Sequence, residues 1–164
     1  MGLFSFLRGA GSDELKKKEV EATKEAVNQA NNAAMEAILH SKKVLTLEGI
    51  VNSLEIPVTD LSIQLDHDTV TVGGTVASQS DKEKIVLALG NVDGIAVVDD
   101  QLIAENQEPE ASFYEVKSGD SLSKIAKAYY GDPMKYPVIF EANKPMLKDP
   151  NKIYPGQQLR IPKI

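Results

Sequence analysis

Residues 61–76, "LSIQLDHDTVTVGGTV", decide the fold of the first half of the chain. Apolar side chains alternate with polar ones at Leu61, Ile63 and Leu65, and the alternation resumes at Val70 and Val72. Such a period of two is typical of strands that bury one face, and a short polar break between two such runs predicts a hairpin. We therefore predict two antiparallel strands with a turn at residues 66–68.

Helices and a third strand complete this unit. Leu47, Val51 and Leu54 lie on one helical stripe, which Pro57 stops. Residues 80–89 repeat the helical pattern, with Ser80 and Glu83 predicted as a capping box and Gly90 as the residue just past the helix end. Residues 94–104, "GIAVVDDQLIA", read as a closing strand. The order αββαβ predicts a small α+β domain with helices on one face of a mixed sheet.

The remaining segments divide the chain further. Residues 1–43 are an N-terminal arm followed by a helix with a thin apolar face, and residues 44–104 are the αββαβ unit. Residues 105–112 are acidic, contain proline and are typical of a linker. Residues 113–164 have the pattern βααβ, where Pro137 predicts that the second helix starts late or kinks. We therefore expect two small α+β domains.

Composition excludes several classes of function. The 164 residues are 42% hydrophobic, include no cysteine and carry a net charge of −6 without a long basic run. Disulfides and thiolate chemistry are excluded, and a nucleic-acid partner is disfavoured because it requires basic patches. The apolar run at the N-terminus is too short for a signal peptide, and no segment reaches the length of a membrane span. We expect a cytoplasmic monomer that does not bind membranes.

Catalytic patterns are missing from the sequence. His40 and His67 are the two histidines, and neither lies in a zinc or nucleophile motif. Asp66, His67 and Asp68 could suggest a metal site, but a solvated hairpin turn is the simpler interpretation. Adjacent carboxylates at residues 99 and 100 would point to opposite faces of a strand and form no acid–base pair. We predict a protein that is not an enzyme.

Residues 89–95, "LGNVDGI", allow two interpretations. One is a glycine-capped helix end followed by a turn, with Gly94 in the last turn position. The other is an ion site made of backbone carbonyls, because the last carbonyls of a helix lack partners and carry partial negative charge. Rings of neutral carbonyls suit potassium, whereas calcium and magnesium sites recruit carboxylates. Asp93 alone is not a carboxylate set, so the sequence leaves both interpretations open.

Two stretches resemble known domain families. "YEVKSGDSLSKIA", "IFEANK" and "IYPGQQLRIP" stand at the spacing of a LysM domain, and "VTVGGTV" with "GNVDGIAVVDDQL" is similar to a BON domain. The order BON then LysM, together with the start "MGLFSFL" and "FEANKPMLKDPNKIYPGQ", resembles the small cytoplasmic potassium-binding proteins of Gram-negative bacteria.

This resemblance implies a potassium site made of backbone carbonyls from two segments. Carried over by position, the loop contributes Gly90, Val92 and Ile95, and the N-terminal segment contributes Leu7, Ala10 and Ser12. Rubidium and caesium would substitute for potassium and sodium would not. The implied role is a potassium sensor or buffer whose LysM domain docks on the BON domain when the ion binds.

An alternative follows from the LysM resemblance alone. LysM domains bind glycans that contain N-acetylglucosamine, in a groove between the first strand–helix loop and the second helix–strand loop. The matching positions are Gly119, Asp120, Ser121, Leu122, Met146, Leu147 and Ile153. Asp120 or Ser121 could equally cap the following helix. The alternative is an envelope module that binds peptidoglycan, which would need export.

Overall fold

A computed structural model describes residues 11–164, with side chains from residue 20 onward. The described chain divides at residue 43 into two units. Helix α1 (Gly11–Ser53) is uninterrupted over its 43 residues, so the helix predicted within residues 1–43 and the stripe around residues 47–54 are one helix.

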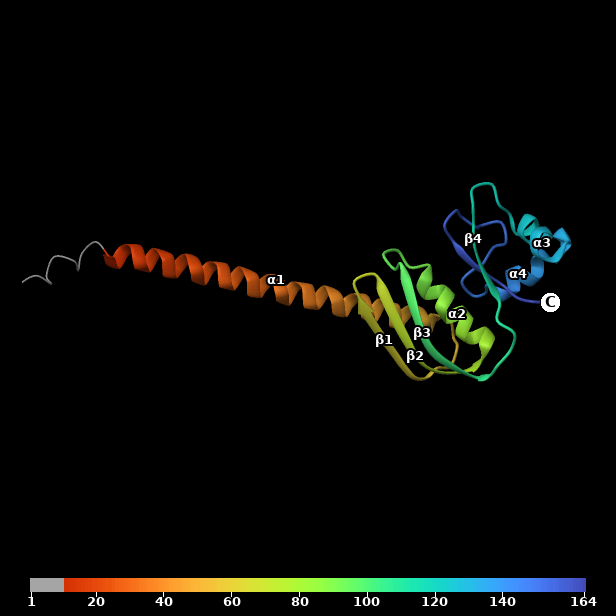
Figure 1. The fold of residues 1–164 in the computed structure, drawn as a ribbon, viewed down its shortest axis with the longest axis horizontal. Helices are drawn as coiled ribbons and strands as arrows, with labels where there is room; N and C mark the ends of the chain where they lie inside the picture. Colours follow the sequence, from red (N-terminus) through yellow and green to blue (C-terminus); the bar gives the residue numbers. More distant parts are fainter. Residues whose placement is uncertain (1–10) are drawn as a thin grey trace, which may run out of the picture. The chain divides into compact units, whose positions relative to one another are not determined.

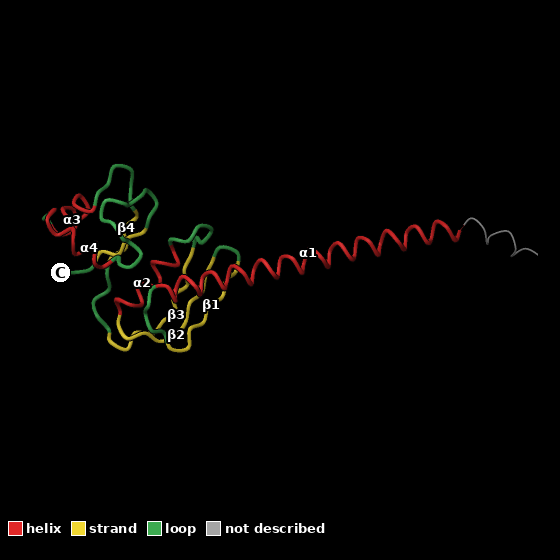
Figure 2. Tube along the Cα trace, turned by 180° about the vertical axis from the view of Figure 1, so that it is seen from behind, coloured by secondary structure: helices red, strands yellow, loops and turns green. Residues whose placement is uncertain are grey.

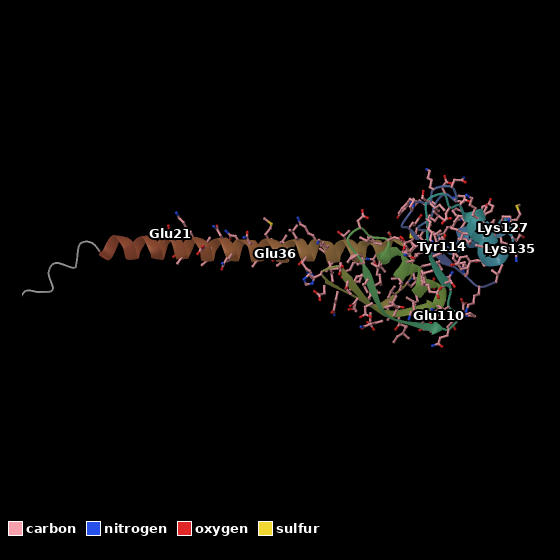
Figure 3. The ribbon with its side chains drawn as sticks, turned by 45° about the horizontal axis from the view of Figure 1, so that its top comes forward. Glu21, Glu36, Glu110, Tyr114, Lys127 and Lys135 are labelled. Carbon is pink, nitrogen blue, oxygen red and sulfur yellow. The ribbon has the colours of Figure 1, made fainter. Side chains whose placement is uncertain are left out.

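The first unit has no side chain buried in a core among residues 20–42. Every residue there is exposed, including Val20, Val27 and Met35, and Figure 3 labels Glu21 and Glu36 on this helix. The helix in this region is therefore held by its own backbone hydrogen bonds and local side-chain pairs. The expectation of a thin apolar face agrees with this exposure.

The second unit begins with the predicted mixed sheet. Strand β1 (Thr59–Asp66) pairs antiparallel with β2 (Thr69–Ser78), and β2 pairs parallel with β3 (Val97–Asn106). Helix α2 (Gln79–Gly90) makes the crossover between the two parallel strands. Figure 1 and Figure 2 show the three strands side by side in the order β1-β2-β3. The hairpin turn consists of residues 67–68, within the predicted range, and Asp66 is the last residue of β1; His67 has a φ of 54°.

Both helices of this region bury their apolar stripes against the sheet. The core contains Leu47 and Val51 from α1, Ile85 and Leu89 from α2, and strand residues that include Val70, Val72, Val76 and Leu102. The predicted capping box is wrong, because α2 begins two residues earlier: Ser78 is the N-cap and its hydroxyl accepts from the N–H of Asp81 at 3.1 Å. Glu83 therefore takes no part in capping the helix.

The last 53 residues have the predicted βααβ order. Strand β4 (Ser112–Glu115) pairs antiparallel with β5 (Gln158–Ile161), and between them lie α3 (Leu122–Tyr130), the short 3₁₀ helix η1 (Pro133–Lys135) and α4 (Tyr136–Ala142). Pro137 falls in the first turn of α4, where its missing N–H costs nothing, so the second helix starts late as expected. This region has its own core, formed by Val116, Leu122, Ile125, Ala126, Ile139, Leu147, Leu159 and Ile161.

Caps fix the ends of the helices in this second region. Ser121 caps α3 by accepting from the N–H of Lys124 at 3.3 Å, and Gly131 ends the helix at a φ of 74°.

Tyr114, labelled in Figure 3, packs edge-on against Tyr129 with ring centroids 5.9 Å apart. Lys127 and Lys135, also labelled there, are exposed. Within the described residues, no helix is both long and apolar enough to cross a membrane.

Candidate functional site

A short loop connects the end of α2 to the start of β3. Gly90 is the last helical residue, and Asn91 caps the helix with φ −90° and ψ 5°. The prediction of Gly90 as the residue past the helix end is therefore wrong by one position. Gly94 has a φ of 89°, a conformation that favours glycine, so its predicted turn role is confirmed.

The carbonyls of this loop differ in how they are paired. The Leu87 carbonyl accepts from the backbone N–H of Asn91 at 3.1 Å and from its side-chain Nδ2 at 2.9 Å. The Val92 carbonyl accepts from the N–H of Ile95 at 3.1 Å, which leaves its second lone pair. Among residues 11–164, no donor reaches the carbonyl of Gly90 or that of Ile95. Two of the three predicted loop ligands thus have carbonyls without a donor in the described residues, and one of them, Gly90, is the last residue of α2, at the negative end of that helix.

The apolar side chains of this loop pack against the protein core. Val92 and Ile95 are half-buried and pack against the core of the sheet, whereas Asp93 is exposed. In the described part of the chain, no group of three or more His, Cys, Asp or Glu residues could hold a metal ion. What this loop can offer an ion is backbone oxygen backed by aliphatic side chains.

The three predicted N-terminal ligands are largely outside the structure. Leu7 and Ala10 lie outside the described residues. Ser12 falls in the first turn of α1, and its side chain is outside the described set. Their part in the site stays a prediction.

The same loop contacts the βααβ region through Asn91. The side-chain Oδ1 accepts from the N–H of Gln158 at 2.8 Å, and Nδ2 donates to the carbonyl of Gln158 at 3.1 Å. Nδ2 also lies 3.2 Å from the sulfur of Met146. Asn91 therefore stands between two predicted ligand residues in sequence while its side chain binds the other domain.

A buried ion pair forms a second contact between the same two regions. Arg160 Nε donates to Glu83 Oε2 at 2.5 Å, and the two residues are 6% and 4% exposed. The other carboxylate oxygen of Glu83 accepts from Gln79 Nε2 at 3.0 Å and from the N–H of Ala111 at 2.9 Å. Burial opposes ionisation of Glu83, but the hydrogen bonds from Gln79, Ala111 and Arg160 outweigh it and lower its pKa.

Sequence reasoning missed both contacts. One sequence pattern could have indicated that Glu83 is buried. It lies four residues before Leu87, on the helix face that carries this apolar residue and Gly90. Arg160 lies in an otherwise apolar closing strand, where a charge needs a partner. Neither pattern identifies which residue is the partner.

The seven positions of the glycan alternative all have structural roles. Leu122 and Leu147 are each 2% exposed in the core, with Met146 and Ile153 packed against it. Gly119 turns at a φ of 85°, and Ser121 is the N-cap of α3. Glycan binding at these positions stays a prediction.

Asp120, the charged member of that set, is held by its own domain. Its Oδ2 accepts from the N–H of Lys117 at 2.8 Å and from the hydroxyl of Tyr114 at 2.7 Å. The hydrogen bond from the Lys117 N–H, followed by that from Tyr114, lowers the pKa of Asp120. The hydrogen bond to Asp120 in turn raises the pKa of Tyr114.

The other aspartates singled out in the sequence form separate contacts. Asp66 and His67 lie 2.6 Å apart on the turn, with side chains 89% and 92% exposed. Asp100 pairs with Lys82 at 3.2 Å, whereas Asp99 accepts from Gln101 at 3.0 Å. Each of these aspartates therefore contacts a different partner, and none of these contacts joins two of them.

Comparison with known families agrees with the two structural regions. A BON domain model matches residues 46–106, and a LysM domain model matches residues 114–162. Over 163 residues, 99% of each chain, the protein is 45% identical to the potassium binding protein Kbp of Escherichia coli O6:H1. It is also 48% identical over 58 residues to an uncharacterised protein of Deinococcus radiodurans, which covers 35% of this chain and 22% of that one. The chain belongs to the family of BON–LysM proteins that includes Kbp.

Proposed function

We propose that this protein binds potassium through backbone carbonyls at the end of α2. The ligands are the carbonyls of Gly90, Val92 and Ile95, joined by carbonyls of Leu7, Ala10 and Ser12 from the N-terminal segment. The observation that carries the proposal is the pair of carbonyls, at Gly90 and Ile95, without a donor among residues 11–164. The relationship to a protein named for potassium binding supports the choice of ion.

The chemistry of the loop favours a large monovalent cation. Neutral carbonyls replace the hydration shell of potassium without the carboxylates that calcium and magnesium prefer. Rubidium and caesium have the same demand for several weak oxygen ligands, so we propose that they bind and that sodium does not. Half-buried Val92 and Ile95 support this by limiting the access of water to the loop.

The proposed role is a monomeric cytoplasmic sensor or buffer without enzymatic activity. Docking of the LysM domain on the BON domain accompanies binding of the ion in this proposal. Asn91, the residue after Gly90, contacts Gln158 of the LysM domain, and this contact supports a link between ion binding and docking.

The decisive experiment is calorimetric titration of the full chain with potassium in a sodium-free buffer of an organic cation. Rubidium, caesium and sodium are titrated at matched ionic strength. Potassium is expected to bind saturably and to raise the thermal midpoint, since a hundredfold excess over Kd adds about 2.7 kcal/mol. Equal binding of sodium and potassium would overturn the proposed selectivity.

A shortened chain tests the N-terminal half of the site. A protein that starts at Ser12 lacks Leu7 and Ala10 but retains every helix and strand described above. We expect it to remain folded by circular dichroism and to lose most of its potassium affinity. Normal affinity in the shortened chain would remove the N-terminal carbonyls from the site.

A further inference from the structure

We propose that Asn91 is a positioning residue that couples potassium binding to docking of the LysM domain. The inference rests on the proposed potassium site and adds to it the means by which one domain regulates the other. Asn91 lies between the ligand residues Gly90 and Val92, while its side chain binds the LysM strand β5. The conformation of one residue thus belongs to the loop and to the domain contact.

The Asn91 amide is used on both of its atoms. Oδ1 accepts from the Gln158 N–H at 2.8 Å, and Nδ2 donates to the Gln158 carbonyl at 3.1 Å. Nδ2 also reaches back to the Leu87 carbonyl of its own helix at 2.9 Å. The side chain therefore holds the end of α2 and strand β5 together. It does so in the way that a neighbouring strand residue would.

The LysM domain contains the same device within itself. Asn143 follows α4, donates from Nδ2 to the carbonyls of Ile139 at 2.6 Å and Arg160 at 2.8 Å, and accepts from the Arg160 N–H at 2.7 Å. Residues two apart in a strand present their N–H and C=O groups to the same edge. Asn143 and Asn91 therefore close one edge of β5, the first from within the domain and the second from the BON domain.

This geometry makes ion affinity and docking depend on each other. An ion at the carbonyls of Gly90 and Val92 restricts the backbone on both sides of Asn91 and lowers the entropy cost of aiming its amide at Gln158. By linkage, docking at Gln158 must favour ion binding by the same factor. Loss of the LysM contact should weaken potassium binding even though no ligand carbonyl changes.

Asn91→Asp in the full chain separates this coupling from simple electrostatics. The substitution keeps the shape of the side chain but replaces the donating Nδ2 with an oxygen that faces the carbonyls of Leu87 and Gln158. Coupling predicts about tenfold weaker potassium binding by calorimetry, despite the added negative charge. Charge alone would strengthen binding of a cation. Asp93→Asn, an exposed position in the same loop, is the matched control and should change affinity by less than about twofold.

A variant on the LysM side tests whether the effect crosses the interface. Gln158→Pro removes the N–H that donates to Asn91 Oδ1 and leaves the loop sequence intact; proline is tolerated at strand edges. We expect potassium binding weakened about threefold, with the thermal unfolding transition retained. If Asn91→Asp weakens binding while a folded Gln158→Pro protein binds normally, Asn91 serves the loop alone and the coupling is wrong.

Amide hydrogen exchange in the unsubstituted protein supplies a test independent of both variants. The Gln158 N–H donates to Asn91 and the Arg160 N–H donates to Asn143, so the two amides are matched reporters on one strand. Potassium should slow exchange at Gln158 and leave Arg160 unchanged. Potassium binding without any change at Gln158 overturns the coupling but leaves the proposed function standing, whereas absence of potassium binding overturns the proposed function itself.

Discussion

The ends of α2 and α4 both bind β5 through an asparagine side chain, and the two contacts differ in how deeply they are buried. Asn91 and Asn143 cap their helices with similar backbone angles, φ −90° and ψ 5° against φ −108° and ψ 7°, and both amides bind β5. Asn143 is 1% exposed within its own domain, whereas Asn91 is half-buried at a contact between domains. An identical set of hydrogen bonds is worth more where water cannot replace it, so burial separates a structural anchor from a reversible one.

The largest expected effect is on stability, and it compares the two asparagines directly. Asn143→Ala orphans the N–H and the C=O of buried Arg160. At about 1–3 kcal/mol for each buried orphan, we expect a loss of about 4 kcal/mol in the free energy of unfolding. Asn91→Ala should cost about 1 kcal/mol without potassium, because water can reach the groups it leaves. Urea unfolding of both variants measures the difference, and equal losses would contradict the role of burial.

Removing the buried ion pair should have the next largest effect. Glu83→Gln leaves the Arg160 guanidinium buried without its counter-ion, which costs about 3 kcal/mol at neutral pH. Glu141→Gln, which removes the exposed pair with Lys144, is the control and should cost less than about 0.5 kcal/mol. Thermal unfolding distinguishes the two, and a loss in Glu83→Gln as small as that expected for the control would contradict a stabilising Glu83–Arg160 contact.

The Glu83–Arg160 pair should make the free energy of unfolding fall as the pH is lowered. The pKa of Glu83 is lowered in the folded protein, so its contribution is present above the pKa of the unfolded chain. That contribution is lost as pH falls through the folded pKa. Stability measured from pH 7 downward should therefore decline less steeply in Glu83→Gln than in the unsubstituted protein.

Substitutions at two glycines sharpen the comparison at the ion loop, where the proposed carbonyls set α2 apart from α4. Gly94→Val forces a branched side chain into a φ of 89°, at a cost of about 1–2 kcal/mol, and should weaken potassium binding about tenfold. Gly90→Ala is the control, because the new Cβ would lie 3.6 Å from Val98 Cγ2, an ordinary contact. Its affinity should stay within about twofold. Equal losses by calorimetry would show that the turn at Gly94 has no special role in setting the carbonyl directions.

The smallest expected effect concerns charge beside the loop. Lys84 lines a cleft of about 820 Å³ that Asn91 and Val92 also border. Lys84→Gln removes a positive charge near the proposed cation, so potassium affinity should rise by no more than about twofold. The gain should vanish at high ionic strength, where the Debye length is about 3 Å at 1 M. A decrease in affinity would show that Lys84 has a structural role.

Periodicity predicted the strands and helices that form the sheet domain because their apolar faces are well separated, but it did not predict that residues 11–53 form one helix. The alternation at Ile63, Leu65 and Val70 fixed the hairpin, and the stripe at Leu47 and Val51 predicted the helix that covers it. The helix boundary failed at Ser80, since Ser78 offers the same hydroxyl two residues earlier. Local patterns do not choose between two competent caps.

The candidate site was less accessible to sequence reasoning. Backbone carbonyls leave no side-chain signature, so the resemblance supplied Gly90, Val92 and Ile95, and the structure added that two of these carbonyls lack donors among residues 11–164. Asn91 could not be singled out, because its partner lies 67 residues away and offers only backbone atoms. Such a contact depends on tertiary structure alone.

The closed edge of β5 also bears on how copies of this chain meet in solution. An open strand edge presents unpaired N–H and C=O groups that can recruit a strand from another molecule. Asn143 and Asn91 occupy those groups at Arg160 and Gln158. The asparagine between the domains thus protects the smaller sheet from intermolecular pairing, and the half of the edge that it covers is the half that separation of the domains would expose to aggregation.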